Sequence, residues 1–110
     1  MERIDWEHFE RVDLRIGTVV KAEPFPEALR PAIKMTIDFG PLGLKKTSAQ
    51  ITDFYTPESL LGRQVVAVVN FPPKQIGPIL SEILVLGGLT SDGVVLLNSD
   101  KQIPNGTQIA

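Results

Sequence analysis

The stretch Thr56-Pro57-Glu58-Ser59-Leu60-Leu61-Gly62 decides between the fold classes that the rest of the chain allows. It predicts a very short helix. Thr56 is a good N-cap, and Pro57 fits the first helical position, where its missing N–H costs nothing. Glu58 favours the positive end of the helix dipole, and Gly62 suits the helix end. The place of this helix among the predicted strands selects the fold.

Three strands are predicted before the helix. Residues 14–22 are rich in β-branched side chains, and Gly17 within them predicts a bulge or a sharp bend. Apolar and polar side chains alternate over residues 33–39, which predicts a half-buried strand with one polar face. Pro41-Leu42-Gly43 predicts a turn, so residues 44–51 are expected to form the return strand of a hairpin.

Downstream of the helix the predicted strands are residues 64–70, 82–86 and 94–98. The first of these is almost entirely valine and alanine, so we expect it to be buried on both faces. Gly87-Gly88 and Ser91-Asp92-Gly93 predict turns around the last strand. Residues 70–81, which contain three prolines, are interpreted as a loop.

The order strand, strand, strand, short helix, strand, strand is typical of a five-stranded Greek-key barrel of the oligonucleotide-binding type, the OB fold. A β-sandwich competes, but sandwiches usually need about seven strands. We therefore predict an all-β OB-fold barrel with short helices and N- and C-terminal extensions. With 110 residues, no repeat and no linker, the chain is expected to be a single domain, residues 1–110.

The inventory of reactive side chains favours binding over catalysis. The chain has no cysteine and a single histidine, His8, which lies in a charged segment and is interpreted as a surface residue. Asp13, Asp38 and Asp53 include no pair whose spacing demands acid–base chemistry. A zinc site built from cysteine and histidine is excluded by composition. We expect no catalytic residue, no metal and no cofactor.

Positive charge is concentrated in the middle of the chain. Residues 30–80 carry six basic and three acidic side chains, although the whole chain has a net charge of −2. Alternation places Lys34 on the outer face of one strand, and Lys46, Ser48 and Gln50 on the outer face of the next. Lys74 lies in the neighbouring loop. These lysines are candidate phosphate contacts for RNA, and the alternative is an ordinary solvated surface.

The same loop supports a second kind of binding. Phe71, Ile76, Ile79 and Leu80 form an apolar segment with few charges, which is typical of surfaces that capture extended polypeptides. Phe71 is also a candidate for stacking on a base. The alternative interpretation is that these side chains cover the end of the barrel or a subunit interface. Of the other phenylalanines, Phe39 and Phe54 are predicted to be core residues.

Four motifs resemble those of a known family. They are residues 12–19 (VDLRIGTV), residues 55–58 with 61–63 (YTPE and LGR), residues 69–77 (VNFPPKQIG) and Ser81-Glu82. In this order, and over essentially the full length, the chain is similar to the tRNA-binding domain family, specifically its stand-alone CsaA-type export chaperones.

This resemblance implies a homodimeric OB-fold protein that binds unfolded or export-competent polypeptides during protein secretion. It also implies that Ser81 joins Lys34, Lys46 and Lys74 as a candidate RNA contact. Pro72-Pro73, Glu82 and Leu84 depart from the pattern of family members that bind tRNA tightly. A structure-specific tRNA-binding protein is therefore the alternative function.

Two further expectations concern assembly and location. A short helix carrying Trp6, Phe9 and Val12, together with Ile103 and Ile109, adds more apolar surface than one small barrel readily covers, so a twofold dimer is expected. No apolar stretch is long enough to span a membrane, and the N-terminus lacks the pattern of a secretory signal, so the expected compartment is the cytoplasm.

Overall fold

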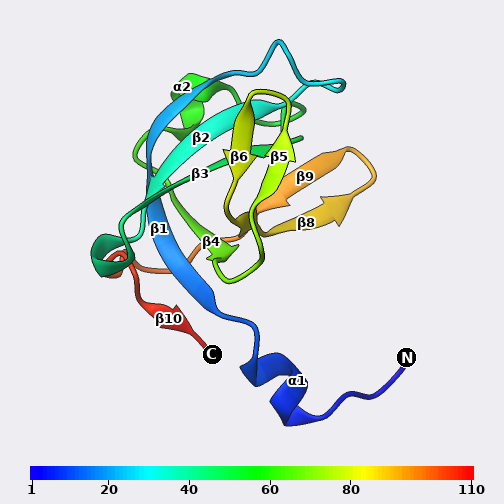
Figure 1. Ribbon diagram of the computed structural model, residues 1–110, viewed down its shortest axis with the longest axis vertical. Helices are drawn as coiled ribbons and strands as arrows, with labels where there is room; N and C mark the ends of the chain where they lie inside the picture. The colour runs from blue at the N-terminus through cyan, green and yellow to red at the C-terminus, as the bar shows by residue number, and fades with distance from the viewer.

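The computed structural model describes residues 1–110 and consists mostly of β-strands (Figure 1). The helices are α1 (Trp6–Glu10), η1 (Gly40–Leu42, a 3-10 turn) and α2 (Pro57–Leu60). The strands are β1 (Leu14–Pro24), β2 (Ile33–Asp38), β3 (Leu44–Ala49), β4 (Gln64–Val68), β5 (Lys74–Ile76), β6 (Ile79–Ser81), β7 (Leu84–Val85), β8 (Gly87–Thr90), β9 (Gly93–Leu96) and β10 (Gln108–Ile109).

Five antiparallel strands form a nearly closed barrel in the order β3-β2-β1-β4-β7, and β10 adds to the free part of β1. The hairpins β5–β6 and β8–β9 are separate two-stranded sheets beside the barrel (Figure 1). This arrangement confirms the predicted all-β barrel of the OB type. Neither α-helix has the length of apolar chain needed to cross a lipid bilayer.

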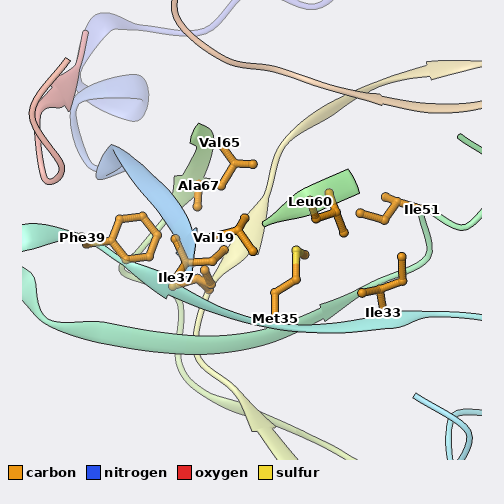
Figure 2. Close-up of a cluster of buried hydrophobic side chains, with 10 residues drawn as sticks. Val19, Ile33, Met35, Ile37, Phe39, Ile51, Leu60, Val65 and Ala67 are labelled. Carbon is orange, nitrogen blue, oxygen red and sulfur yellow. The ribbon is translucent and has the colours of Figure 1, made fainter. Parts of the chain in front are cut away.

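The core has two parts, one on each side of β4. Val65 and Ala67 belong to the larger cluster, which also contains Ile37 and Phe39 (Figure 2). Val66 and Val68 point the other way, into a smaller cluster with Leu14 and Ile16. Because successive side chains of a strand point to opposite faces, β4 is covered on both, as its valine-rich sequence predicts.

The short helix α2 has the predicted termini. Thr56 Oγ1 accepts from the Ser59 backbone N–H at 3.2 Å, and the Thr56 N–H donates to Ser59 Oγ at 2.9 Å. Gly62 ends the helix with a φ of +80°. The helix directs Leu60, which is fully buried, into the larger core cluster beside Ile51 (Figure 2). α2 therefore covers one end of the barrel.

Several local predictions are wrong. The register shift in β1 lies between Val19 and Lys21, not at Gly17. Residues 70–81 contain the hairpin β5–β6, and Gly87-Gly88 belongs to strand β8 instead of a turn. The predicted strand at residues 82–86 shortens to the two residues of β7. Phe39 is buried as predicted, but the Phe54 side chain is 52% exposed, because it lies in the turn before α2.

Candidate functional site

Three lysines share the outer face of β1, β2 and β3, and we call them the basic face: Lys21, Lys34 and Lys46. Thr36 is paired with both Lys21 and Lys46 across the sheet, and Lys34 is paired with Glu23 and Ser48. Cross-strand partners and their neighbours two residues away project from the same side of a sheet. The predicted common face of Lys34, Lys46 and Ser48 is therefore confirmed.

The register shift in β1 is what brings Lys21 to this face. Val19 points into the core and Val20 is 48% exposed, so strict alternation would turn Lys21 inward. The bulge at Val20 lets Lys21 project outward as well, and returns Ala22 to the core side. Sequence reasoning missed Lys21 because alternation alone hides it.

Glu23 and Phe25 interact with two of the ammonium groups of the basic face, and Glu23 offsets part of its positive charge. Glu23 Oε1 lies 3.9 Å from Lys21 Nζ and 3.8 Å from Lys34 Nζ. The Lys34 ammonium also lies 5.4 Å from the centroid of the Phe25 ring. Lys46 makes no ion pair and is exposed. The face keeps a net positive charge around a concavity of about 210 Å³.

The hairpin β5–β6 lies beside the basic face (Figure 1). Its strands pair Lys74 with Ser81, Gln75 with Leu80, and Ile76 with Ile79. By alternation, Lys74, Ile76, Ile79 and Ser81 share the face turned to the barrel, and Leu80 occupies the other. The Gln75 amide donates to the carbonyls of Gly77 and Ile79 at 2.7 and 3.0 Å, which fixes the turn.

The four residues predicted to bind polypeptide are thus divided between locations. Ile79 lines the concavity of the basic face, and Ile76 lines a different, larger groove. Leu80 and Phe71 are 49% and 51% exposed, Leu80 on the outer side of the hairpin and Phe71 ahead of it. The structure does not gather the four side chains into one patch.

Ser81 has an interior position. Its side chain is buried, and its Oγ lies 3.0 Å from Thr47 Oγ1. Both hydroxyls also reach the Ile83 carbonyl, at 3.3 Å from Ser81 and 3.2 Å from Thr47. The Ser81 hydroxyl is therefore used within the protein, whereas Lys34, Lys46 and Lys74 reach the surface.

A second hollow, which we call the apolar groove, runs from the hairpin β5–β6 to the hairpin β8–β9. Its volume is about 1010 Å³, and 11 of its 19 lining residues are hydrophobic. Residues 27–30, the end of β3 and strands β5, β7 and β8 contribute to its walls. Gln50, predicted on the polar face, lies past the end of β3 and lines this groove.

Histidine, tyrosine and aspartate side chains serve as general acids and bases in many enzymes. In this protein they make structural contacts. His8 is exposed, and its Nδ1 accepts from the Asp5 backbone N–H at 3.1 Å. The Tyr55 hydroxyl accepts from the Leu96 N–H at 3.0 Å. Asp13 pairs with Arg15 at 2.6 Å, and Asp38 accepts from the Gly40 N–H at 2.8 Å. Each of these side chains is therefore engaged in a structural contact of its own.

Comparison with known proteins relates the whole chain to two kinds of protein. A family model described as a putative tRNA binding domain matches residues 14–108. The crystal structure of the chaperone CsaA from Bacillus anthracis str. Ames superposes with a TM-score of 0.94 at 55% identity, covering 99% of this chain and 100% of that one. The CsaA chaperone protein from Picrophilus torridus gives a TM-score of 0.92 at 46% identity, covering 98% and 100%.

The second kind is much longer. The methionine–tRNA ligase of Methanocaldococcus jannaschii is 36% identical over 110 residues, which is 99% of this chain and 17% of the ligase. The chain thus spans about a sixth of the length of the curated relatives it matches.

Proposed function

We propose a function for the chain on the premise that it belongs to the tRNA-binding domain family, whose model spans residues 14–108. The chain is a non-catalytic, homodimeric chaperone of the cytoplasm that binds unfolded or export-competent polypeptides during protein secretion. The observation that carries this proposal is the likeness, over the full length of both chains, to two chaperones of the CsaA type.

The apolar groove is the part of the structure that suits an unfolded polypeptide. Its wall is mostly hydrophobic, and residues 74–77 of the hairpin β5–β6 contribute to it. Ile76 lines this groove and Ile79 lines the concavity of the basic face. Leu80 and Phe71 lie outside both hollows, each about half exposed, and serve as separate apolar contacts for a polypeptide. An extended chain with apolar side chains buries hydrophobic surface in such a groove without a strict sequence requirement.

The exposed helix α1 supports the homodimer. None of its residues is buried, and Trp6 and Phe9 are 82% and 41% exposed. Ile4, just before the helix, is 68% exposed. A twofold contact buries the same residues on both subunits, and standard interfaces bury about 800 Å² per partner. Ile4, Trp6 and Phe9 are the exposed apolar side chains that each subunit offers for such a contact.

The second candidate function is structure-specific binding of tRNA. The observation that favours it is the register that places Lys21, Lys34 and Lys46 on one face. Lys74 of the hairpin lines the neighbouring apolar groove. Lysines gathered on one face can contact phosphates and recognise the shape of an RNA without reading its bases. The two functions use neighbouring surfaces, the basic face for tRNA and the apolar groove for polypeptide.

A single titration distinguishes the two functions. Wild-type protein is titrated with labelled tRNA and with a chemically unfolded presecretory polypeptide at salt concentrations from about 50 to 200 mM. We expect the affinity for polypeptide to change little with salt, because apolar burial dominates it. Any affinity for tRNA is expected to fall steeply, because phosphate contacts release counterions.

Matched variants locate the two surfaces. Ile76→Ala in the wall of the apolar groove and Phe71→Ala outside it are each expected to weaken polypeptide binding about five- to tenfold. Phe54→Ala, which removes an equally exposed phenylalanine elsewhere, is expected to leave it unchanged. Lys34→Ala should weaken the binding of all tRNAs to a similar extent, and Lys101→Ala serves as its control. If neither ligand binds, both functions are wrong; if tRNA alone binds, the second candidate replaces the first.

A further inference from the structure

The barrel lacks one ladder between neighbouring strands. The sheet ends at β3 on one side and β7 on the other, and no ladder joins those two strands. In an antiparallel pair, every second residue turns its N–H and C=O away from the partner strand. Lys46, opposite Thr36, is such a residue of β3, so both of its backbone groups point into the gap.

Glu82 makes hydrogen bonds to both backbone groups of Lys46. Its backbone N–H donates to the Lys46 carbonyl at 2.9 Å, and its Oε1 accepts from the Lys46 N–H at 3.2 Å. A residue of a paired strand makes the same two bonds with its own N–H and C=O. At this position the side-chain carboxylate therefore replaces a backbone carbonyl. Its other oxygen, Oε2, lies 3.8 Å from Lys45 Nζ.

The bonds of Glu82 are next to the base of the hairpin β5–β6. Ser81, the last residue of β6, is buried against Thr47, the neighbour of Lys46 on β3. The hairpin has no ladder to any strand of the barrel. At its tip, Gly77 lies over the buried Phe25, where a Cβ would be 3.4 Å from the ring. We call the contacts of Ser81 and Glu82 with β3 the hairpin anchor.

We propose that Glu82 is a positioning residue for the ligand-binding surface. By completing the edge of β3 it holds the hairpin against the barrel, so that Ile79 stays in the concavity of the basic face and Lys74 stays on the wall of the apolar groove. This inference rests on the proposed function, because it takes the hairpin and the basic face as parts of the binding surface. The physical basis is pre-organisation. When the hairpin is docked for only part of the time, the apparent affinity equals the affinity of the docked state multiplied by the docked fraction.

Four variants separate the reach of the side chain from its charge. Glu82→Ala removes the acceptor, and Glu82→Asp keeps the charge but withdraws the oxygens by one methylene. Glu82→Gln keeps an acceptor at the same reach without the charge. Lys45→Ala removes the ion pair and leaves the anchor. Circular dichroism and thermal melting verify that each variant is folded.

The first readout is the anchor itself, measured by amide hydrogen exchange at Lys46 and by 15N relaxation of residues 74–81. We expect E82A and E82D to exchange the Lys46 amide at least about tenfold faster and to mobilise the hairpin, because the N–H then opens to water. E82Q and K45A are expected to remain within about twofold of wild type. An unchanged Lys46 amide in E82A and E82D would overturn the proposal.

The second readout is binding to labelled tRNA and to a reduced, carboxymethylated polypeptide. E82A is expected to lose about tenfold in affinity for a probe that wild type binds, as for a hairpin docked a tenth of the time, and E82Q to restore it. Wild-type affinity in E82A with a mobile hairpin would refute the positioning role. If wild type binds neither probe, the proposed function fails, and the exchange measurement alone decides whether Glu82 holds the hairpin.

Discussion

Gly17 lies within β1, close against two core side chains, Ile37 in β2 and Phe39 just after it. A Cβ at this position would be 2.6 Å from Ile37 Cγ2 and 2.8 Å from the Phe39 ring. The φ angle of Gly17 is not positive, so the glycine is required for space and not for backbone conformation. The residue that sequence reasoning selected is structurally important, but for close packing instead of a bend.

Gly17→Ala is therefore expected to destabilise the protein by about 1–3 kcal/mol, because the added methyl overpacks a dense core. Chemical denaturation at a fixed protein concentration measures the effect. Gly88→Ala is the matched control, because a Cβ there meets only the Val95 carbonyl, at an ordinary 3.8 Å. Equal stability of G17A and wild type would show that Ile37 and Phe39 move aside freely.

The contacts of Glu82 could not be predicted from its residue type. Glu82 and Ser81 together form one of the motifs that resemble the family, but neither residue type indicates that the carboxylate will accept a hydrogen bond from the edge of a strand 36 positions earlier. The same is true of Thr47 and its buried hydroxyl. Contacts between residues so far apart in the chain follow from the closed barrel, which local patterns do not specify.

At the scale of elements, α2 was predictable in full because its signals are local. The cap, the first-turn proline and acid, and the final glycine all lie within seven residues. The alternation of β2 and the valine- and alanine-rich sequence of β4 are equally local, and both strands form as predicted. The hairpin β5–β6 was missed because each strand has three residues, too few for a periodicity to emerge between prolines.

The cap of α2 gives a measurable prediction. Thr56→Ala is expected to cost about 1 kcal/mol, because the Ser59 N–H loses its acceptor at the start of the helix. In a domain of this size the melting temperature should fall by about 4 °C. Thr52→Ala changes an exposed threonine that makes no side-chain hydrogen bond, so it should melt like wild type. If T56A also melted like wild type, the cap would contribute nothing to stability.

At the scale of the whole molecule, the candidate site was partly predictable. The shared face of Lys34 and Lys46 followed from alternation, and the register confirms it. Lys21 was missed because one bulge reverses the alternation of β1. The apolar groove was missed as a whole, because its wall combines five separate segments of the chain. Sites assembled by a barrel depend on which strands meet, and composition contains little of that information.

Helix α1 permits a test of assembly. It lies away from the barrel with Trp6 exposed (Figure 1). If α1 makes the twofold contact, sedimentation should give twice the mass of one chain for wild type, and Trp6→Glu should shift the protein to monomers by burying unpaired charge.

Leu29→Glu is the control, because Leu29 is fully exposed on the loop between β1 and β2, at the opposite end of the molecule (Figure 1). A wild-type monomer would remove the dimer from the proposed function. A W6E variant that stays dimeric would move the contact to another surface.

The strand β4 has one more consequence, which concerns the chain before it folds. Because both of its faces end up covered, residues 65–69 contain no charge, no proline and no glycine. Short segments of high β-propensity without charge are the ones that self-associate when exposed. Before it folds, this chain therefore exposes an aggregation-prone segment of the kind that an export chaperone binds in unfolded polypeptides. The chain must therefore bury both faces of this segment in the two core clusters before the segments of two unfolded copies associate.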